Sequence, residues 1–76
     1  MLTIKGIVSE MSRLMPRHIV ERKGRTNSVD VYTKDRKLGI RTYFSRHELR
    51  RVDSSIYPWM VRLFTTSFNR ATEARK

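Results

Sequence analysis

The start of the chain has the apolar spacing of a helix with one buried face. Apolar residues recur at intervals of three or four, which predicts an amphipathic helix over residues 3–15. These residues are Ile4, Ile7, Val8, Met11, Leu14 and Met15. Thr3 can cap the first turn through its hydroxyl group. Pro16 is expected to end the helix, because the residue before a proline is pushed out of helical geometry. A strand over residues 2–8 is the alternative for the first residues.

Residues 17–44 have the composition and shorter period of strands. Runs rich in β-branched and aromatic residues cover 18–22, 28–33 and 38–44, and polar turns cover 23–27 and 34–37. Such consecutive strands with short connections predict an antiparallel β-meander. Alternation predicts one apolar face, with Val29, Val31, Leu38, Ile40, Thr42 and Phe44, and one outer face, with Asp30, Tyr32, Gly39, Arg41 and Tyr43. The apolar face needs a helix packed against it, and the outer face can meet solvent or a ligand.

Residues 45–76 return to helical patterning. Ser45 and Glu48 have the spacing of a capping box, which predicts a short helix through Arg51 or Val52. The polar residues 53–55 are expected to interrupt it and to cap a second helix, with Pro58 in its first turn. One broad apolar face marks this second helix as the main core helix, and its members are Ile56, Trp59, Met60, Leu63, Phe64, Phe68 and Ala71. We expect residues 71–76 to form a fraying helix end.

These elements predict a small single α+β domain over residues 1–76. Its parts are an N-terminal helix (1–16), a three-stranded antiparallel β-meander (17–44) and C-terminal helices (45–76) packed on one face of the sheet. A chain of 76 residues has room for one domain only. Its core supplies about 3–5 kcal/mol of stability unless a staple adds more. The chain has no cysteine, so the expected staple is a partner, which could be a second copy in a homodimer.

Positive charge is the strongest functional signal in the sequence. Seventeen Lys and Arg stand against seven Asp and Glu, for a net charge of +10. Self-repulsion at this charge costs stability unless a polyanion relieves it. Arginine outnumbers lysine by twelve to five, and its planar fork binds phosphate or carboxylate through two hydrogen bonds. The composition therefore favours a nucleic acid as the partner, with an acidic protein surface as the substitute.

The positive charge concentrates between residues 17 and 51. This stretch holds eleven Lys and Arg against four Asp and Glu, a local charge of +7. Both predicted turns are basic and lie at opposite ends of the meander, and Arg41 on the outer face could join them into a stripe. A ribbon with basic tips can enter a groove or straddle a backbone. The candidate binding residues are Arg17, Arg22, Lys23, Arg25, Lys34, Arg36, Lys37, Arg41, Tyr43, Arg46 and Arg50.

Two tyrosines add a further hypothesis for the outer face. Tyr32 and Tyr43, flanked by Arg41, could form a shared platform on which unpaired bases stack. The alternative is that the two rings only cover the backbone of a small sheet. Asp30 on the same face would repel a nucleic-acid strand that came close.

Other function classes find little support in the sequence. The two histidines, His18 and His47, lack the spacing of a nucleophile–base pair or of a metal site, so we expect no catalysis, metal or cofactor. Apolar stretches are too short to span a membrane, which takes about 20 residues, and the N-terminus lacks the features of a signal peptide. We therefore expect no membrane partner and a cytoplasmic location, in the host cytoplasm if the chain is viral.

Residues 39–51 carry one family likeness. The sequence Gly39-Ile40-Arg41-Thr42-Tyr43-Phe44-Ser45-Arg46-His47-Glu48-Leu49-Arg50-Arg51 resembles the passage from wing to helix in excisionase-type and related winged-helix DNA-binding proteins. In that passage a strand that ends in an aromatic residue runs into a Ser-x-x-Glu-Leu helix start. No helix-turn-helix precedes it here, so no functional role is carried over to these residues.

The sequence thus predicts a small, non-catalytic nucleic-acid-binding protein with a regulatory or accessory role, DNA being slightly favoured over RNA. Its size, charge and lack of cysteine are also common among phage-encoded proteins. One alternative is an inhibitor or adaptor that binds an acidic surface of a larger host nucleic-acid enzyme. A second is a basic structural component of a virion or ribonucleoprotein.

Overall fold

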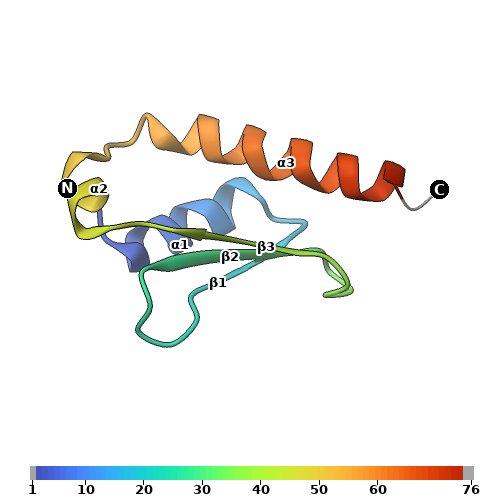
Figure 1. Cartoon of the computed structure of the whole chain (residues 1–76), viewed down its shortest axis with the longest axis horizontal. Helices are drawn as coiled ribbons and strands as arrows, with labels where there is room; N and C mark the ends of the chain where they lie inside the picture. Colours follow the sequence, from blue (N-terminus) through green and yellow to red (C-terminus); the bar gives the residue numbers. More distant parts are fainter. Residues whose placement is uncertain (1, 75–76) are drawn as a thin grey trace.

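The chain folds into a three-stranded sheet that carries helices on one face (Figure 1). The computed structural model describes residues 2–74. Its elements are α1 (Ile4–Leu14), β1 (Ile19–Glu21), β2 (Ser28–Tyr32), β3 (Gly39–Tyr43), α2 (Arg46–Arg51) and α3 (Ile56–Ala74). The α+β arrangement predicted from the sequence is confirmed, and the first residues form a helix rather than a strand. Residues 75 and 76 of the expected fraying end lie outside the described part.

The sheet is an antiparallel meander in the order β1–β2–β3. In its register Val31 of β2 lies opposite Val20 of β1 and Ile40 of β3. Val29 and Val31 are fully buried beneath the helices, as the alternation of apolar and polar residues predicts. The outer face pairs Asp30 with Arg41 across the strands.

Helices α1 and α3 share the inner face of the sheet (Figure 1). Each contributes three side chains spaced one turn apart to a single core: these are Ile4, Ile7 and Met11 from α1, and Met60, Phe64 and Phe68 from α3. Because α1 already covers part of the sheet, α3 buries a narrow stripe and not a broad face. Trp59 and Leu63, which the pattern placed in the core, are 57% and 36% exposed, so that part of the prediction is wrong.

Local side-chain hydrogen bonds fix the ends of the helices. Thr3 Oγ1 accepts from Gly6 N–H at 3.0 Å, and α1 ends at Leu14, just before Met15 and Pro16. Ser45 and Glu48 form the predicted capping box, with both hydrogen bonds at 3.1 Å. These caps satisfy N–H groups that the first turn of a helix leaves without partners.

None of the helices within residues 2–74 has the length and apolar character needed to cross a lipid bilayer.

Candidate nucleic-acid interface

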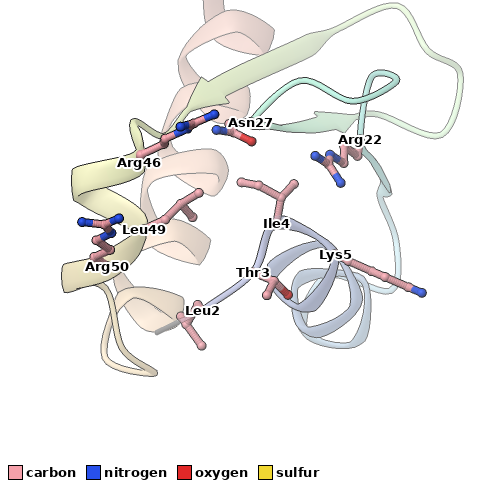
Figure 2. Close-up of a pocket in the computed structure, with 9 residues that line it drawn as sticks. All are labelled: Leu2, Thr3, Ile4, Lys5, Arg22, Asn27, Arg46, Leu49 and Arg50. Atoms are coloured by element: carbon pink, nitrogen blue, oxygen red, sulfur yellow. The ribbon is translucent and has the colours of Figure 1, made fainter.

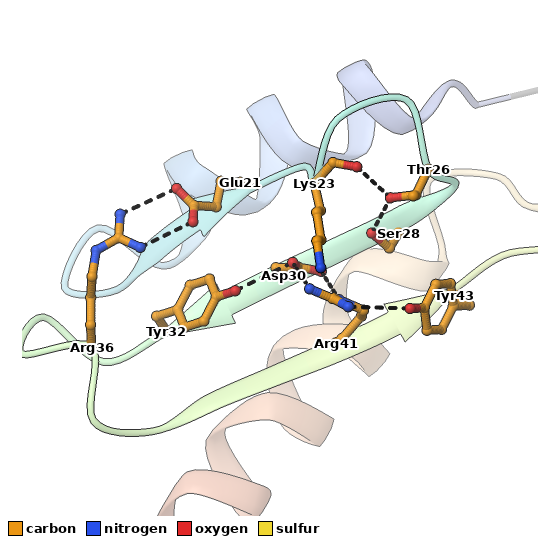
Figure 3. Close-up of polar contacts among 9 residues, drawn as sticks. All are labelled: Glu21, Lys23, Thr26, Ser28, Asp30, Tyr32, Arg36, Arg41 and Tyr43. Carbon is orange, nitrogen blue, oxygen red and sulfur yellow. Dashed lines mark hydrogen bonds and ion pairs between the residues drawn. The ribbon is translucent and has the colours of Figure 1, made fainter.

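The outer face of the sheet is held together by an ion pair. Asp30 is 2% exposed, and its two carboxylate oxygens accept hydrogen bonds from Arg41 Nε and Nη2, each at 3.0 Å (Figure 3). The hydrogen bonds with Asp30, and then with the Tyr43 hydroxyl, raise the pKa of the Arg41 guanidinium above its usual value. Arg41 therefore neutralises a buried carboxylate, and its charge is not free to extend a basic stripe from one turn to the other.

A second ion pair lies at the edge of the same face. Arg36 donates to both carboxylate oxygens of Glu21, at 3.1 and 3.3 Å, and its guanidinium lies 5.4 Å from the centre of the Tyr32 ring (Figure 3). Arg36 has a φ of 59°, an uncommon backbone conformation for a residue other than glycine. Together, the two ion pairs leave the centre of the outer face close to charge balance.

The register separates the two tyrosines that could have formed a stacking platform. Tyr32 lies opposite Gly39, whereas Tyr43 lies opposite Ser28. These positions are four residues apart along β2, or about 13 Å at the usual rise of a strand. The expected closeness of the two rings is therefore wrong. Tyr43 is the more accessible of the two, at 62% exposed, with the Arg41 guanidinium 5.9 Å from its ring centre.

Gly39 explains why Tyr32 lies flat on the sheet. A Cβ atom at Gly39 would come within 2.5 Å of the Tyr32 ring. The ring therefore occupies the place of the missing side chain and covers the backbone of β3. Tyr32 therefore covers the backbone of the sheet, as the alternative to the stacking platform predicts.

The β1–β2 turn, residues 22–27, holds its shape through its own polar groups. Arg22 donates from Nε to the Thr26 carbonyl at 2.8 Å and from Nη2 to the Arg25 carbonyl at 3.2 Å. Gly24 has a φ of +56°, which a residue with a side chain adopts only with strain. The Thr26 hydroxyl is 2.8 Å from that of Ser28, which is fully buried (Figure 3). These contacts fix the shape of the turn. Lys23 and Arg25 on it are exposed, and Figure 3 shows the Lys23 side chain extending over the outer face toward Asp30 and Arg41.

The start of α1, the β1–β2 turn and α2 meet around a cleft of about 300 Å³. Figure 2 shows Arg46 and Arg50 of α2 on one side of this cleft, and Arg22 and Lys5 on the other. With Lys23 and Arg25 of the adjoining turn, these side chains form what we call the basic end: Lys5, Arg22, Lys23, Arg25, Arg46 and Arg50. None of the nine described residues that line the cleft is acidic.

The acidic residue on α2 is part of the helix cap and pairs with none of the cations of the basic end. Glu48 lies on α2, and its carboxylate accepts the hydrogen bond from Ser45 N–H in the capping box. Three ion pairs are present within residues 2–74, and each involves an arginine outside the basic end: they are Arg13–Glu10, Arg36–Glu21 and Arg41–Asp30. The positive charge of the basic end is therefore not compensated by these pairs.

The remaining candidate residues lie elsewhere on the molecule. Lys34 and Lys37 lie in the β2–β3 turn at the other end of the sheet (Figure 1). Hydrogen bonds from the Thr33 hydroxyl and the Lys37 amide lower the pKa of Asp35 in this turn. Arg17 follows the C-terminal end of α1, and it borders a different hollow. The structure thus gathers Arg22, Lys23, Arg25, Arg46 and Arg50, adds Lys5, and leaves the other candidates apart.

The histidines have no shared site. His18 stacks on Phe68, with ring centres 5.1 Å apart, and His47 lies exposed on α2. Among residues 2–74, no group of three acidic or histidine side chains is placed to hold a metal ion.

We expect Asp30→Asn to lower the melting temperature by several degrees, since it removes the negative charge that pairs with Arg41 and replaces one of the two buried acceptors by a donor. Affinity for duplex DNA should change no more than in Glu73→Gln, which removes the same charge from an exposed position. Thermal unfolding and fluorescence anisotropy measure the two effects. A clear gain in DNA affinity specific to Asp30→Asn would show that the sheet face itself contacts DNA.

Comparisons of the chain with protein-family models, with curated proteins and with solved structures gave no match. The likeness of residues 39–51 to winged-helix proteins therefore stays a prediction, although the strand, the Ser45 cap and the short helix it involves are all present.

Proposed function

We propose that the chain is a non-catalytic nucleic-acid-binding protein that contacts phosphates through the basic end. The observation that supports this most is that Lys5 of α1, Arg22 of the β1–β2 turn and Arg46 and Arg50 of α2 border one cleft. Lys23 and Arg25 lie on the adjoining turn at the same end of the molecule. The proposed role is regulatory or accessory, and DNA is slightly favoured over RNA. Phosphate contacts of this kind position a protein on a nucleic acid and carry little sequence information.

The chemistry of the basic end suits a phosphate backbone. Arg22, Arg25, Arg46 and Arg50 each present a planar fork, which can bind two phosphate oxygens at once. Arg22 is held by two carbonyl groups of the turn, so less side-chain entropy is lost when it binds. Binding a polyanion there would also relieve the repulsion that a net charge of +10 imposes on a small domain.

The second candidate function is that of an inhibitor or adaptor that docks on an acidic protein surface. The apolar lining of the cleft, from Leu2, Ile4 and Leu49, favours it, because phosphates gain nothing from an aliphatic surface. The role of a virion or ribonucleoprotein component would rest on charge alone. A homodimer also stays a prediction, for which the exposed Trp59 and Leu63 supply apolar side chains.

Competition binding can separate these candidates. The probe is a fluorescent random-sequence DNA duplex at low salt, displaced by unlabelled duplex DNA, single-stranded DNA, duplex RNA or polyglutamate at equal charge. We expect the nucleic acids to displace the probe and polyglutamate to compete weakly, because the phosphates of a nucleic acid are more densely spaced than the carboxylates of polyglutamate and release more condensed counterions on binding. Equal or stronger competition by polyglutamate, or no binding of the duplex at all, would support the acidic protein partner instead.

A further inference from the structure

The cleft at the basic end has a floor that phosphate binding does not use. Figure 2 shows Leu49 pointing from α2 toward Ile4, with Leu2 below them and the cationic side chains around the rim. Ile4 is buried, while Leu2 and Leu49 are half-buried and border the open volume of about 300 Å³. An aliphatic surface left open to water is a cost that a ligand of matching shape would remove.

The lining is unsuited to a nucleic-acid base. Bases bind proteins mainly by stacking on aromatic rings, and none of the nine described lining residues is aromatic. Aliphatic side chains instead match the leucine, isoleucine or phenylalanine side chains of a peptide. Asn27 at the edge of the cleft offers a donor and an acceptor to a peptide backbone.

We propose that this cleft binds a short acidic peptide segment of a partner protein, with one large apolar side chain seated between Leu2, Ile4 and Leu49. The carboxylates that flank the apolar residue would lie against Arg22, Arg46 and Arg50. Two features of the site carry the proposal: the aliphatic floor selects the apolar residue, and the rim, which has no acidic member, selects the charge. Opposite charges across such a surface also speed association.

This site adds a ligand beyond the proposed nucleic-acid binding, and the two ligands would share the same arginines. A bound peptide would therefore cover Arg22, Arg46 and Arg50 and lower the affinity for nucleic acid. By linkage, nucleic acid would lower the affinity for the peptide by the same factor. An acidic partner could in this way release the protein from DNA.

Two synthetic peptides test the proposal. One is a short peptide of Glu and Asp with one central leucine, and the other has alanine in place of that leucine. We expect the leucine peptide to bind about tenfold tighter, because burial of one leucine side chain supplies about that much binding free energy. It should also displace labelled DNA at lower concentration. Leu49→Gln should abolish this preference, whereas Leu63→Gln, which changes an exposed leucine of α3, should keep it. Equal affinities of the two peptides for the unaltered protein would overturn the proposal.

Two further readouts keep the test decisive. Amide shifts in the unaltered protein should change at residues 2–5 and 46–50 with the leucine peptide and much less with the alanine peptide, so the test survives if Leu49→Gln does not fold. Duplex DNA binding by folded Leu49→Gln should be retained, which separates this proposal from the nucleic-acid proposal. If Leu49→Gln instead weakens binding of DNA with an unpaired terminal nucleotide, the cleft holds a base and the peptide proposal is wrong.

Discussion

Phe64→Ala is expected to remove most of the folding stability of this protein. Phe64 has no exposed surface and lies between Met60 and Phe68 in the buried stripe of α3. Truncation of a buried phenylalanine costs about 3–5 kcal/mol, and a single core of this size supplies about the same amount. We expect the variant to be largely unfolded at room temperature, as measured by circular dichroism and chemical denaturation.

Trp59→Ala is the matched control on the same helix. Its side chain is larger than that of Phe64, but it is 57% exposed, so we expect a loss of less than about 1 kcal/mol. A loss comparable to that of Phe64→Ala would contradict the assignment of the buried face. If this loss also depended on protein concentration, Trp59 would be covered by a second copy, and the predicted homodimer would be supported.

The difference in exposure between Phe64 and Trp59 shows what hydrophobic patterning can and cannot predict. Spacing predicted which side of α3 is apolar, and it located the caps and the three strands because their signals are local. How wide the buried face is depends on the neighbours of the helix. Helix α1 occupies part of the same sheet face (Figure 1), and no local pattern near Trp59 or Leu63 reports its position.

In the candidate site, too, local features could be predicted from the sequence and contacts between distant residues could not. The charged turns and α2 could be found from the sequence, since composition reveals them directly. The commitment of Arg41 to Asp30 depends on the strand register, and so does the separation of Tyr32 from Tyr43. Sequence patterning does not place Lys5 with Arg22 and Arg46, because these residues border one cleft only when the start of α1 meets the turn and α2 in three dimensions.

Removing charge from the basic end is expected to have the largest effect on function. The variant Lys23→Gln, Arg25→Gln, Arg50→Gln takes away three of the six cations there, while all three side chains are exposed and leave the core untouched. We expect its affinity for duplex DNA to fall by at least about tenfold at low salt, because contacts between cations and phosphates supply most of the affinity in non-specific binding. Fluorescence anisotropy with a labelled duplex measures the loss.

The control removes equal charge from other exposed positions. Lys34→Gln, Lys37→Gln, Arg70→Gln changes the opposite turn and the outer side of α3, and it lowers the net charge by the same three units. We expect a much smaller loss of affinity, with both variants melting close to the unaltered protein. Equal losses in the two variants would mean that net charge, and not the basic end, determines binding.

The dependence of DNA affinity on salt concentration measures how many phosphates the basic end contacts. If the six cations of the basic end contact phosphates, the plot of log K against log salt concentration should have a slope of about −5, at roughly −0.9 for each contact. This slope corresponds to about a thousandfold loss of affinity between 50 and 200 mM salt. The basic-end variant should reduce the slope to about −2 to −3, and the control variant should retain it. A slope near zero, or no binding of duplex DNA at 50 mM salt, would contradict the proposal that this protein binds nucleic acid through its basic end.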